Sequence, residues 1–370
     1  MPDHSILPAD PAALPIAPPQ SLGFDPAALA DAVGFALAHE SPWPRDIRAH
    51  LEAGFFEPPP DNEILGPVRP RGAPNGLLLR RGRVAARWGD TRQVDMTFSV
   101  AKSYLAILAG LAVGDGLIPD LDAPVRALVG DGGFDAAQNA GITWRQLLQN
   151  TSEWEGTLFG KSDRIDRGRN LVVEGKGQKG QARPLHRPGA YWEYNDVRVN
   201  RLSLALLRRF GRPLPEVFAE RIMRPIGASA DWEWHGYETS WVDLGGRRVH
   251  SVSGGGHWGG GVFIHAEDQA RIGQLVLQDG VWDGTRLLPE GWVAQCRAPS
   301  ALNPAYGLLW WLNTGRAKWP SASAESYAFS GAGGNITWVD PVAGLVAVLR
   351  WVDATRLDGF LAAVGAALRG

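Results

Sequence analysis

A serine three residues before a lysine, at the start of a long apolar run, is the feature that most constrains this chain. Ser99 and Lys102 are followed by residues 103–114, none of which is charged. Residues three apart share one face of a helix, so the Ser99 hydroxyl and the Lys102 amine should meet at its first turn. A helix that is apolar all round is buried, and burial favours the neutral amine of lysine. The pattern therefore predicts a buried helix that presents a serine nucleophile beside its base.

The spacing by itself could be a coincidence, so other segments have to support it. Only five of the 37 basic residues are lysines, and Lys102 alone among them has a serine three positions before it. A second candidate is Tyr194, just ahead of an expected helix at 195–210, where a phenol beside an ammonium can take and return a proton. The alternative interpretation is an ordinary core tyrosine.

A third candidate segment, residues 329–334, reads Phe-Ser-Gly-Ala-Gly-Gly and lies between two expected strands. Its small residues would let a substrate carbonyl approach the backbone. One of its N–H groups could then pair with the N–H of Ser99 to stabilise an oxyanion. The alternative is a plain glycine turn.

Composition excludes several other classes of function. The chain has 370 residues, 45% of them hydrophobic, which is enough for one large core or two closely packed ones. A net charge of −2 gives no electrostatic footprint for nucleic acid or an anionic membrane. The single Cys296 excludes an intramolecular disulfide and a cysteine zinc site. His257 and His265 lack a metal spacing and are interpreted as structural, so no metal or cofactor is expected.

The N-terminus does not resemble a secretory signal, and no stretch of 18 apolar residues is present. We therefore expect a cytoplasmic protein with a small-molecule substrate, no membrane or nucleic-acid partner, and possible assembly as a homo-oligomer.

The pattern along the chain predicts an α/β (α+β) fold. Expected elements are a hairpin that turns at Arg81-Gly82, strands at 335–339 and 345–351, and helices at 25–38, 143–149, 195–210, 267–277 and 353–368. The predicted organisation is an extended arm at 1–24, a sheet region formed by 25–114 and 241–370, and a mainly helical region at 115–240. Antiparallel strands would be flanked by N- and C-terminal helices.

The order of the three motifs resembles the serine β-lactamase and penicillin-binding-protein superfamily. The nearest branch is that of class C β-lactamases with the related esterases and 6-aminohexanoate-dimer hydrolases. Residues 114–125, 142–148 and 266–273 are also similar to segments of that family, and the resemblance runs from about Gly76 to Leu368.

This resemblance implies a β-lactamase/transpeptidase-like fold and a serine hydrolase that cleaves a small ester or amide through an acyl-enzyme. Ser99 would be the nucleophile, Lys102 its base or proton shuttle, and Tyr194 the second acid–base group. The N–H groups of Ser99 and Ala332 would form the oxyanion hole. Candidate substrate-binding residues are Asn150, Trp154, Trp192, Asp196, Trp258, Phe329, Ser330 and Gly331.

The sequence departs from the family pattern at three places. Phe329 stands where relatives have the Lys or His that binds a substrate carboxylate, and Asp196 stands where Asn is frequent. Asn150-Thr-Ser-Glu153 replaces His-Thr-Ser-Gly. These departures favour neutral substrates over β-lactams and D-alanyl-D-alanine peptides. A β-lactamase or D-alanyl-D-alanine peptidase remains the alternative enzyme, and a non-catalytic binding protein is the alternative from another class.

Overall fold

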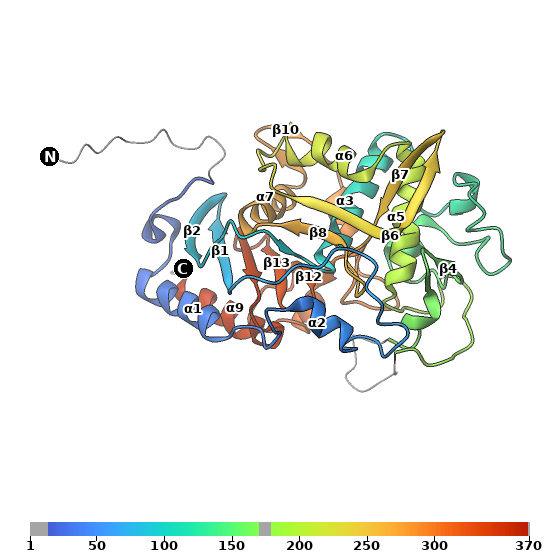
Figure 1. Ribbon diagram of the computed structural model, residues 1–370. Helices are drawn as coiled ribbons and strands as arrows, with labels where there is room; N and C mark the ends of the chain where they lie inside the picture. The colour runs from blue at the N-terminus through green and yellow to red at the C-terminus, as the bar shows by residue number, and fades with distance from the viewer. Residues whose placement is uncertain (1–13, 170–178, 369–370) are drawn as a thin grey trace.

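The computed structural model describes residues 14–169 and 179–368, in which both ends of the chain enter one antiparallel sheet (Figure 1). The strand order is β11-β12-β13-β14-β1-β2, so the first strand pairs with the last one in the chain. The strands are β1 (Asn75–Arg80), β2 (Arg83–Trp88), β11 (Trp311–Leu312), β12 (Tyr327–Gly331), β13 (Asn335–Asp340) and β14 (Leu345–Arg350).

Helices cover both faces of this sheet. On one face, α1 (Pro26–Ala38) packs against α9 (Leu357–Ala367), while α3 (Val100–Gly114) and α7 (Ala266–Leu277) lie on the other (Figure 1). The approach of α7 is close, because a Cβ added to Gly273 would lie 2.6 Å from a methyl carbon of Val346 on β14. The fold class predicted from the sequence is therefore confirmed.

Local sequence signals account for the boundaries of several elements. The Asp25 carboxylate accepts the N–H groups of Ala27 and Ala28 and so caps α1. Arg81 and Gly82 both have positive φ, 52° and 75°, which gives the tight β1–β2 hairpin the twist of its strands. Both elements begin and end within a residue or two of the expected positions.

A second, four-stranded sheet of order β3-β8-β6-β7 joins the large sheet to the remaining helices. Its longest strand, β6, begins at Glu233, inside the range for which the sequence predicts a mainly helical region. A short helix, α2, lies between α1 and β1, where the sequence predicts no element. The bounds are α2 (Ile47–Glu52), β3 (Asp95–Met96), α4 (Trp144–Leu148), β4 (Thr157–Leu158), β5 (Lys161–Ser162), α5 (Asp196–Phe210), α6 (Leu214–Phe218), β6 (Glu233–Leu244), β7 (Arg247–Val252), β8 (Gly261–Ile264), β9 (Val281–Trp282), β10 (Thr285–Arg286) and α8 (Trp292–Cys296).

Arg350, the last residue of β14, connects the two sheets close to the turn that holds Ser99. Its buried guanidinium donates to Asn335 Oδ1 at 2.7 Å, to the Ile264 carbonyl at 2.7 Å and to the Met96 carbonyl at 3.1 Å. Backbone carbonyls from two strands of the small sheet are therefore held by one side chain of the large sheet. This fixes the end of β3, from which the chain turns into α3.

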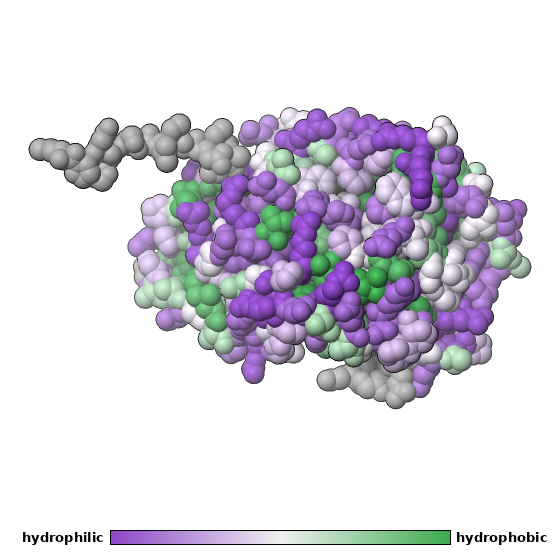
Figure 2. Space-filling view, in the orientation of Figure 1, coloured by the Kyte–Doolittle hydropathy of each residue, from purple (hydrophilic) through white to green (hydrophobic). Residues whose placement is uncertain are grey.

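The surface shown in Figure 2 is mostly hydrophilic, and its apolar residues form small, separate patches. Among the described residues, no helix combines the length and the apolar character needed to cross a membrane.

Candidate active site

Ser99 lies in the tight turn between β3 and α3. The preceding residue, Phe98, has a φ of 50°, a conformation that non-glycine residues rarely adopt. Ser99 itself is the N-cap residue of α3, but its side chain makes no capping hydrogen bond. The hydroxyl is instead 2.7 Å from Lys102 Nζ, as the spacing in the sequence predicts.

A glycine-rich loop, residues 253–261, packs against this turn. The carbonyl of Gly254 accepts a hydrogen bond from Lys102 Nζ at 3.2 Å. At Gly255 a Cβ would lie 2.0 Å from the Phe98 carbonyl oxygen, and its φ is 72°. Only glycine fits this approach, so the glycines let the loop touch the backbone beside Ser99.

Lys102 is buried, and its Nζ lies 2.6 Å from Asp196 Oδ1. Burial acts to lower the pKa of Lys102. The negative charge of Asp196 is the main effect that opposes burial, and the pKa is raised as a result. Burial likewise acts to raise the pKa of Asp196, yet Lys102, His257 and Arg169 hold it well below the usual range. The expectation of a neutral amine is therefore wrong, because it rested on burial alone. Lys102 is an ammonium that can donate to Ser99.

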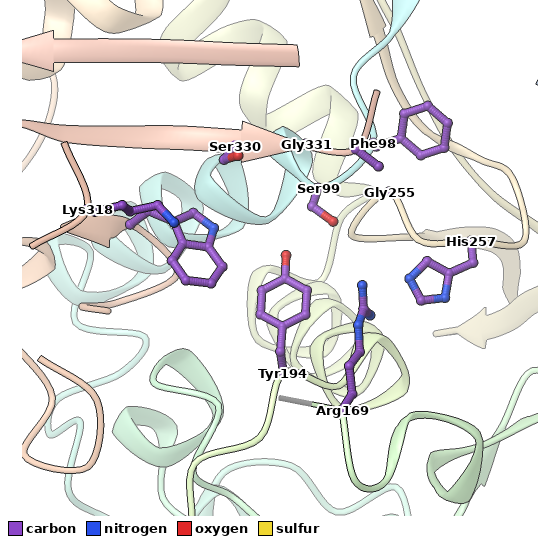
Figure 3. A pocket seen from close by; sticks show the side chains of 11 residues that line it. Phe98, Ser99, Arg169, Tyr194, Gly255, His257, Lys318, Ser330 and Gly331 are labelled. Carbon is purple, nitrogen blue, oxygen red and sulfur yellow. The ribbon is translucent and has the colours of Figure 1, made fainter. Parts of the chain in front are cut away.

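Tyr194 comes from the segment just before α5 and faces the same turn. Figure 3 shows its hydroxyl directed toward Ser99. Its ring centre is 5.1 Å from Lys102 Nζ and 4.9 Å from the Arg169 guanidinium carbon, so two cations lie near the phenol. The ring also stacks on Trp311, at 5.7 Å between centroids, which holds it in place.

The C-terminal end of β12 closes the site on the other side. A Cβ on Gly331 would lie 2.0 Å from the Thr97 carbonyl oxygen and 3.1 Å from the Ser99 amide nitrogen. The strand therefore runs directly against the backbone of the nucleophile turn. Ala332 is the next residue and also lines the pocket. An oxyanion hole formed by the two N–H groups stays a prediction.

These groups open into one pocket of about 220 Å³ (Figure 3). It is lined by Phe98, Ser99, Arg169, Tyr194, Gly255, His257, Trp311, Lys318, Ser330, Gly331 and Ala332. Of the residues chosen from the sequence, Ser99, Tyr194, Ser330, Gly331 and Ala332 are in this lining. Lys102 and Asp196 lie directly behind it.

Besides Asp196, five of the proposed substrate-binding residues lie outside the lining. Asn150 donates to the Tyr306 hydroxyl at 3.0 Å, and the indole N–H groups of Trp154 and Trp258 donate to backbone carbonyls. Trp192 packs edge-on against Tyr306 at 5.4 Å and supports the wall from behind. These side chains stabilise the site without facing a substrate.

Phe329, the fifth, is fully buried in the core. Because side chains alternate along a strand, Phe329 points into the core, toward α3. The centre of its ring lies 6.2 Å from that of Tyr104 on α3 and 5.0 Å from that of Trp310. The expectation that Phe329 contacts the substrate is therefore corrected. Ser330, its neighbour, is the side chain of this strand that lines the pocket.

Six pocket residues are not among those chosen from the sequence: Phe98, Arg169, Gly255, His257, Trp311 and Lys318. Arg169 pairs with Asp196 at 3.1 Å and Asp166 at 3.5 Å. Lys318 Nζ lies over the rings of Trp311 and Trp319, 4.5 and 5.7 Å from their centroids. Arg169 and Lys318 sit in irregular polar segments without a periodic signal. His257 was visible in its glycine loop, but was interpreted as structural.

The replacement of glycine by Glu153 has a clear structural role. Its φ of 50° is the left-handed conformation that glycine adopts readily. Burial acts to raise the pKa of Glu153, but ion pairs with Arg183 and Arg198 outweigh it and lower the pKa to about 2. The Glu153 carboxylate thus forms ion pairs with Arg183, which precedes Tyr194 in the chain, and with Arg198, which follows it on α5.

Glu57, Asp166 and His257 are close enough together to share a metal ion. The ammonium of Lys179 already lies among them, 3.1 Å from Asp166 and 2.8 Å from His257 Nδ1, and it also bonds Glu57. The Lys179 ammonium therefore already occupies the position among these three side chains that a metal ion would take.

Known proteins show the same fold and family. Residues 78–356 match the family model described as Beta-lactamase. A penicillin-binding-protein homologue from Caulobacter crescentus superposes with a TM-score of 0.58 at 17% identity, covering 87% of this chain and 98% of that one. A family VIII carboxylesterase gives 0.57 at 16% identity, over 85% and 95% of the two chains.

Among curated sequences, a Salmonella paratyphi B protein named "Putative D-alanyl-D-alanine carboxypeptidase" is 28% identical over 116 residues. That alignment covers 30% of this chain and only 25% of the relative. The family model, by contrast, extends over most of this chain and includes all three motifs. The chain therefore belongs to the β-lactamase family of serine hydrolases.

Proposed function

We propose that this protein hydrolyses a small ester or amide through an acyl-enzyme on Ser99. The observation that carries the proposal is the hydrogen bond of 2.7 Å between Lys102 Nζ and Ser99 Oγ, in a pocket that Tyr194 also lines. A serine held by a cation and faced by a second proton carrier has the parts needed for nucleophilic catalysis. The carboxylesterase that shares this fold supports an ester substrate.

The ion pair with Asp196 decides how the proton moves. Lys102 is already protonated, so it cannot take the proton of Ser99. Tyr194 is then the candidate base: in its deprotonated form its oxygen would accept that proton as Ser99 Oγ attacks the substrate carbonyl carbon. The Lys102 ammonium stabilises the negative charge that develops on Ser99.

The N–H groups of Ser99 and Ala332 would receive the oxyanion of the tetrahedral intermediate. Its collapse expels the alcohol or amine, which takes the proton back from Tyr194 and leaves the acyl group on Ser99. Water repeats the sequence: Tyr194 accepts its proton, the hydroxide adds to the ester carbon, and Ser99 leaves with that proton.

Ser99 should be labelled by a fluorophosphonate, because phosphonylation requires the same activated hydroxyl. Intact-mass analysis should show one adduct on the wild type and none on Ser99→Ala. Ser330→Ala is the matched control and should still be labelled, since this serine lines the pocket but has no hydrogen bond from a lysine among the described residues. Equal labelling of wild type and Ser99→Ala would refute the assignment.

Lys102 and Tyr194 should each be needed for turnover. Lys102→Met and Tyr194→Phe are expected to lose at least roughly 10²-fold in kcat, the usual scale of acid–base catalysis. The double variant should lose much less than the product of the two single losses, because both groups serve the same step, the attack of Ser99. Tyr104→Phe is the control, since its buried hydroxyl has no hydrogen-bond partner among the described residues. Near-wild-type turnover by Tyr194→Phe would make that tyrosine a structural residue.

The structure removes the sequence-based reasons for excluding substrates that carry a carboxylate. Phe329 does not reach the pocket, and the charge of Asp196 is neutralised by Lys102. Lys318 lines the pocket instead, and within the described part of the chain no carboxylate lies within 4.0 Å of its ammonium. Crowding by protein atoms lowers the pKa of Lys318, a cost that an anionic substrate group would offset. The β-lactamase or peptidase alternative therefore stays open.

A matched pair of esters should show the effect of Lys318. We expect the p-nitrophenyl ester of a short neutral acid and that of a similar acid ending in carboxylate to differ by less than about tenfold in kcat/KM. A tenfold difference in kcat/KM corresponds to about 1.4 kcal/mol in free energy. Lys318→Met should lower kcat/KM at least fivefold for the charged ester alone. If the neutral ester is over 100-fold faster with the unmodified protein, Lys318 does not bind the carboxylate.

A further inference from the structure

His257 lines the pocket, yet both of its ring nitrogens are occupied by protein groups. Nε2 is 2.7 Å from Asp196 Oδ2, and Nδ1 is 2.5 Å from Glu57 Oε1. The ring of Phe56 stacks on the imidazole at 4.1 Å, and only 3% of the His257 side chain is exposed. This histidine is therefore fixed in place between two carboxylates, those of Glu57 and Asp196.

Asp196 is the group that His257 orients. One carboxylate oxygen, Oδ1, faces Lys102 Nζ at 2.6 Å, and the other, Oδ2, faces His257 Nε2 at 2.7 Å and Arg169 at 3.1 Å. A carboxylate held at both oxygens cannot rotate away from one partner without losing the other. A continuous series of contacts thus runs from Glu57 through His257, Asp196 and Lys102 to Ser99.

Among the described residues, three carboxylates and three cations surround this series. The carboxylates are those of Glu57, Asp166 and Asp196, and the cations are Lys102, Arg169 and Lys179. All three carboxylates are at most 4% exposed, so an unmatched charge among them would be costly.

We propose that His257, anchored by Glu57, is a positioning residue that holds Asp196 against Lys102 and thereby keeps Lys102 protonated. The groups that face Lys102 are Asp196, Tyr194 and Arg169. Without His257, Asp196 would be free to turn toward Arg169, and the buried ammonium would lose its short contact. Burial would then lower the pKa of Lys102. The kinetic consequence of this inference rests on the proposed function, but its test does not.

The direct test is the titration of Lys102 by NMR of protein labelled with ¹³Cε-lysine. The chain has only five lysines, so the Lys102 signal can be assigned by its absence in Lys102→Met. In the wild type we expect the signal to remain at its ammonium position up to about pH 10. In His257→Ala it should titrate at least one pH unit lower, a tenfold weaker proton affinity. His257→Gln, which keeps an N–H donor, should restore at least half of that shift.

Two further variants make the result decisive. Asp196→Asn should shift the Lys102 titration more than His257→Ala does. His250→Ala is the matched control, because this histidine stacks on Trp241 in the β6–β7 hairpin and should leave Lys102 unchanged. An unchanged Lys102 titration in folded His257→Ala would overturn the proposal. So would equal shifts in His257→Ala and His257→Gln, which would indicate loss of packing rather than of a donor. Should His257→Ala not fold, the glutamine and asparagine variants decide: the proposal requires a smaller shift in His257→Gln than in Asp196→Asn.

No substrate is needed for this measurement. If Ser99 is not labelled by a fluorophosphonate but Lys102 responds as expected, the proposed function fails and the positioning role stands. If Ser99 is labelled and Lys102 does not respond, the reverse holds.

Discussion

The ion pair between Lys102 and Asp196, buried beneath Ser99, is the interaction on which the site depends. It reverses the effect that burial has on a lysine, and so it turns an expected base into a fixed positive charge. That charge holds the Ser99 hydroxyl at 2.7 Å, and in the mechanism we propose it leaves Tyr194 as the proton carrier. A buried charge survives only when it is paired and hydrogen-bonded, which explains why further ionisable residues surround the pair.

The fold brings these groups together from distant parts of the chain. Ser99 and Lys102 come from the start of α3, Tyr194 and Asp196 from the start of α5, and Ser330 and Gly331 from the end of β12. Arg350 fixes the strand that leads to Ser99, and glycines at 255 and 331 allow two other segments to touch the same backbone turn. Contacts from both sheets therefore fix the position of Ser99. They also hold Phe98 at a φ value that non-glycine residues rarely adopt.

Local patterns in the sequence were sufficient for several elements and for the contact between Ser99 and Lys102. The cap at Asp25, the Arg81-Gly82 turn and the Ser99–Lys102 spacing are short-range signals, and each appears in the structure as expected. Long-range contacts were not predictable in this way. Phe329 was expected in the pocket from its place in a motif, although strand alternation turns it into the core.

Arg169 and Lys318 lie in irregular segments, where spacing gives no indication of direction. The state of Lys102 required knowledge of its partner, because burial and a carboxylate at 2.6 Å have opposite effects on its pKa. His257 contacts Asp196, 61 positions away in the chain, and Glu57, 200 positions away. No local sequence pattern records contacts between residues so far apart. Site chemistry that arises from pairing is therefore the part that sequence reasoning missed.

The central claim is that Ser99 carries the acyl group during turnover. It is tested most directly by mixing the enzyme with a p-nitrophenyl ester, quenching in acid within the first turnovers and mapping the tryptic peptides by mass. Cleavage after Arg92 and Lys102 releases residues 93–102, in which Ser99 is the only serine. The account predicts that this peptide gains the mass of the acyl group. An acyl group on a different peptide, or a burst of nitrophenol with residues 93–102 unmodified, would contradict it.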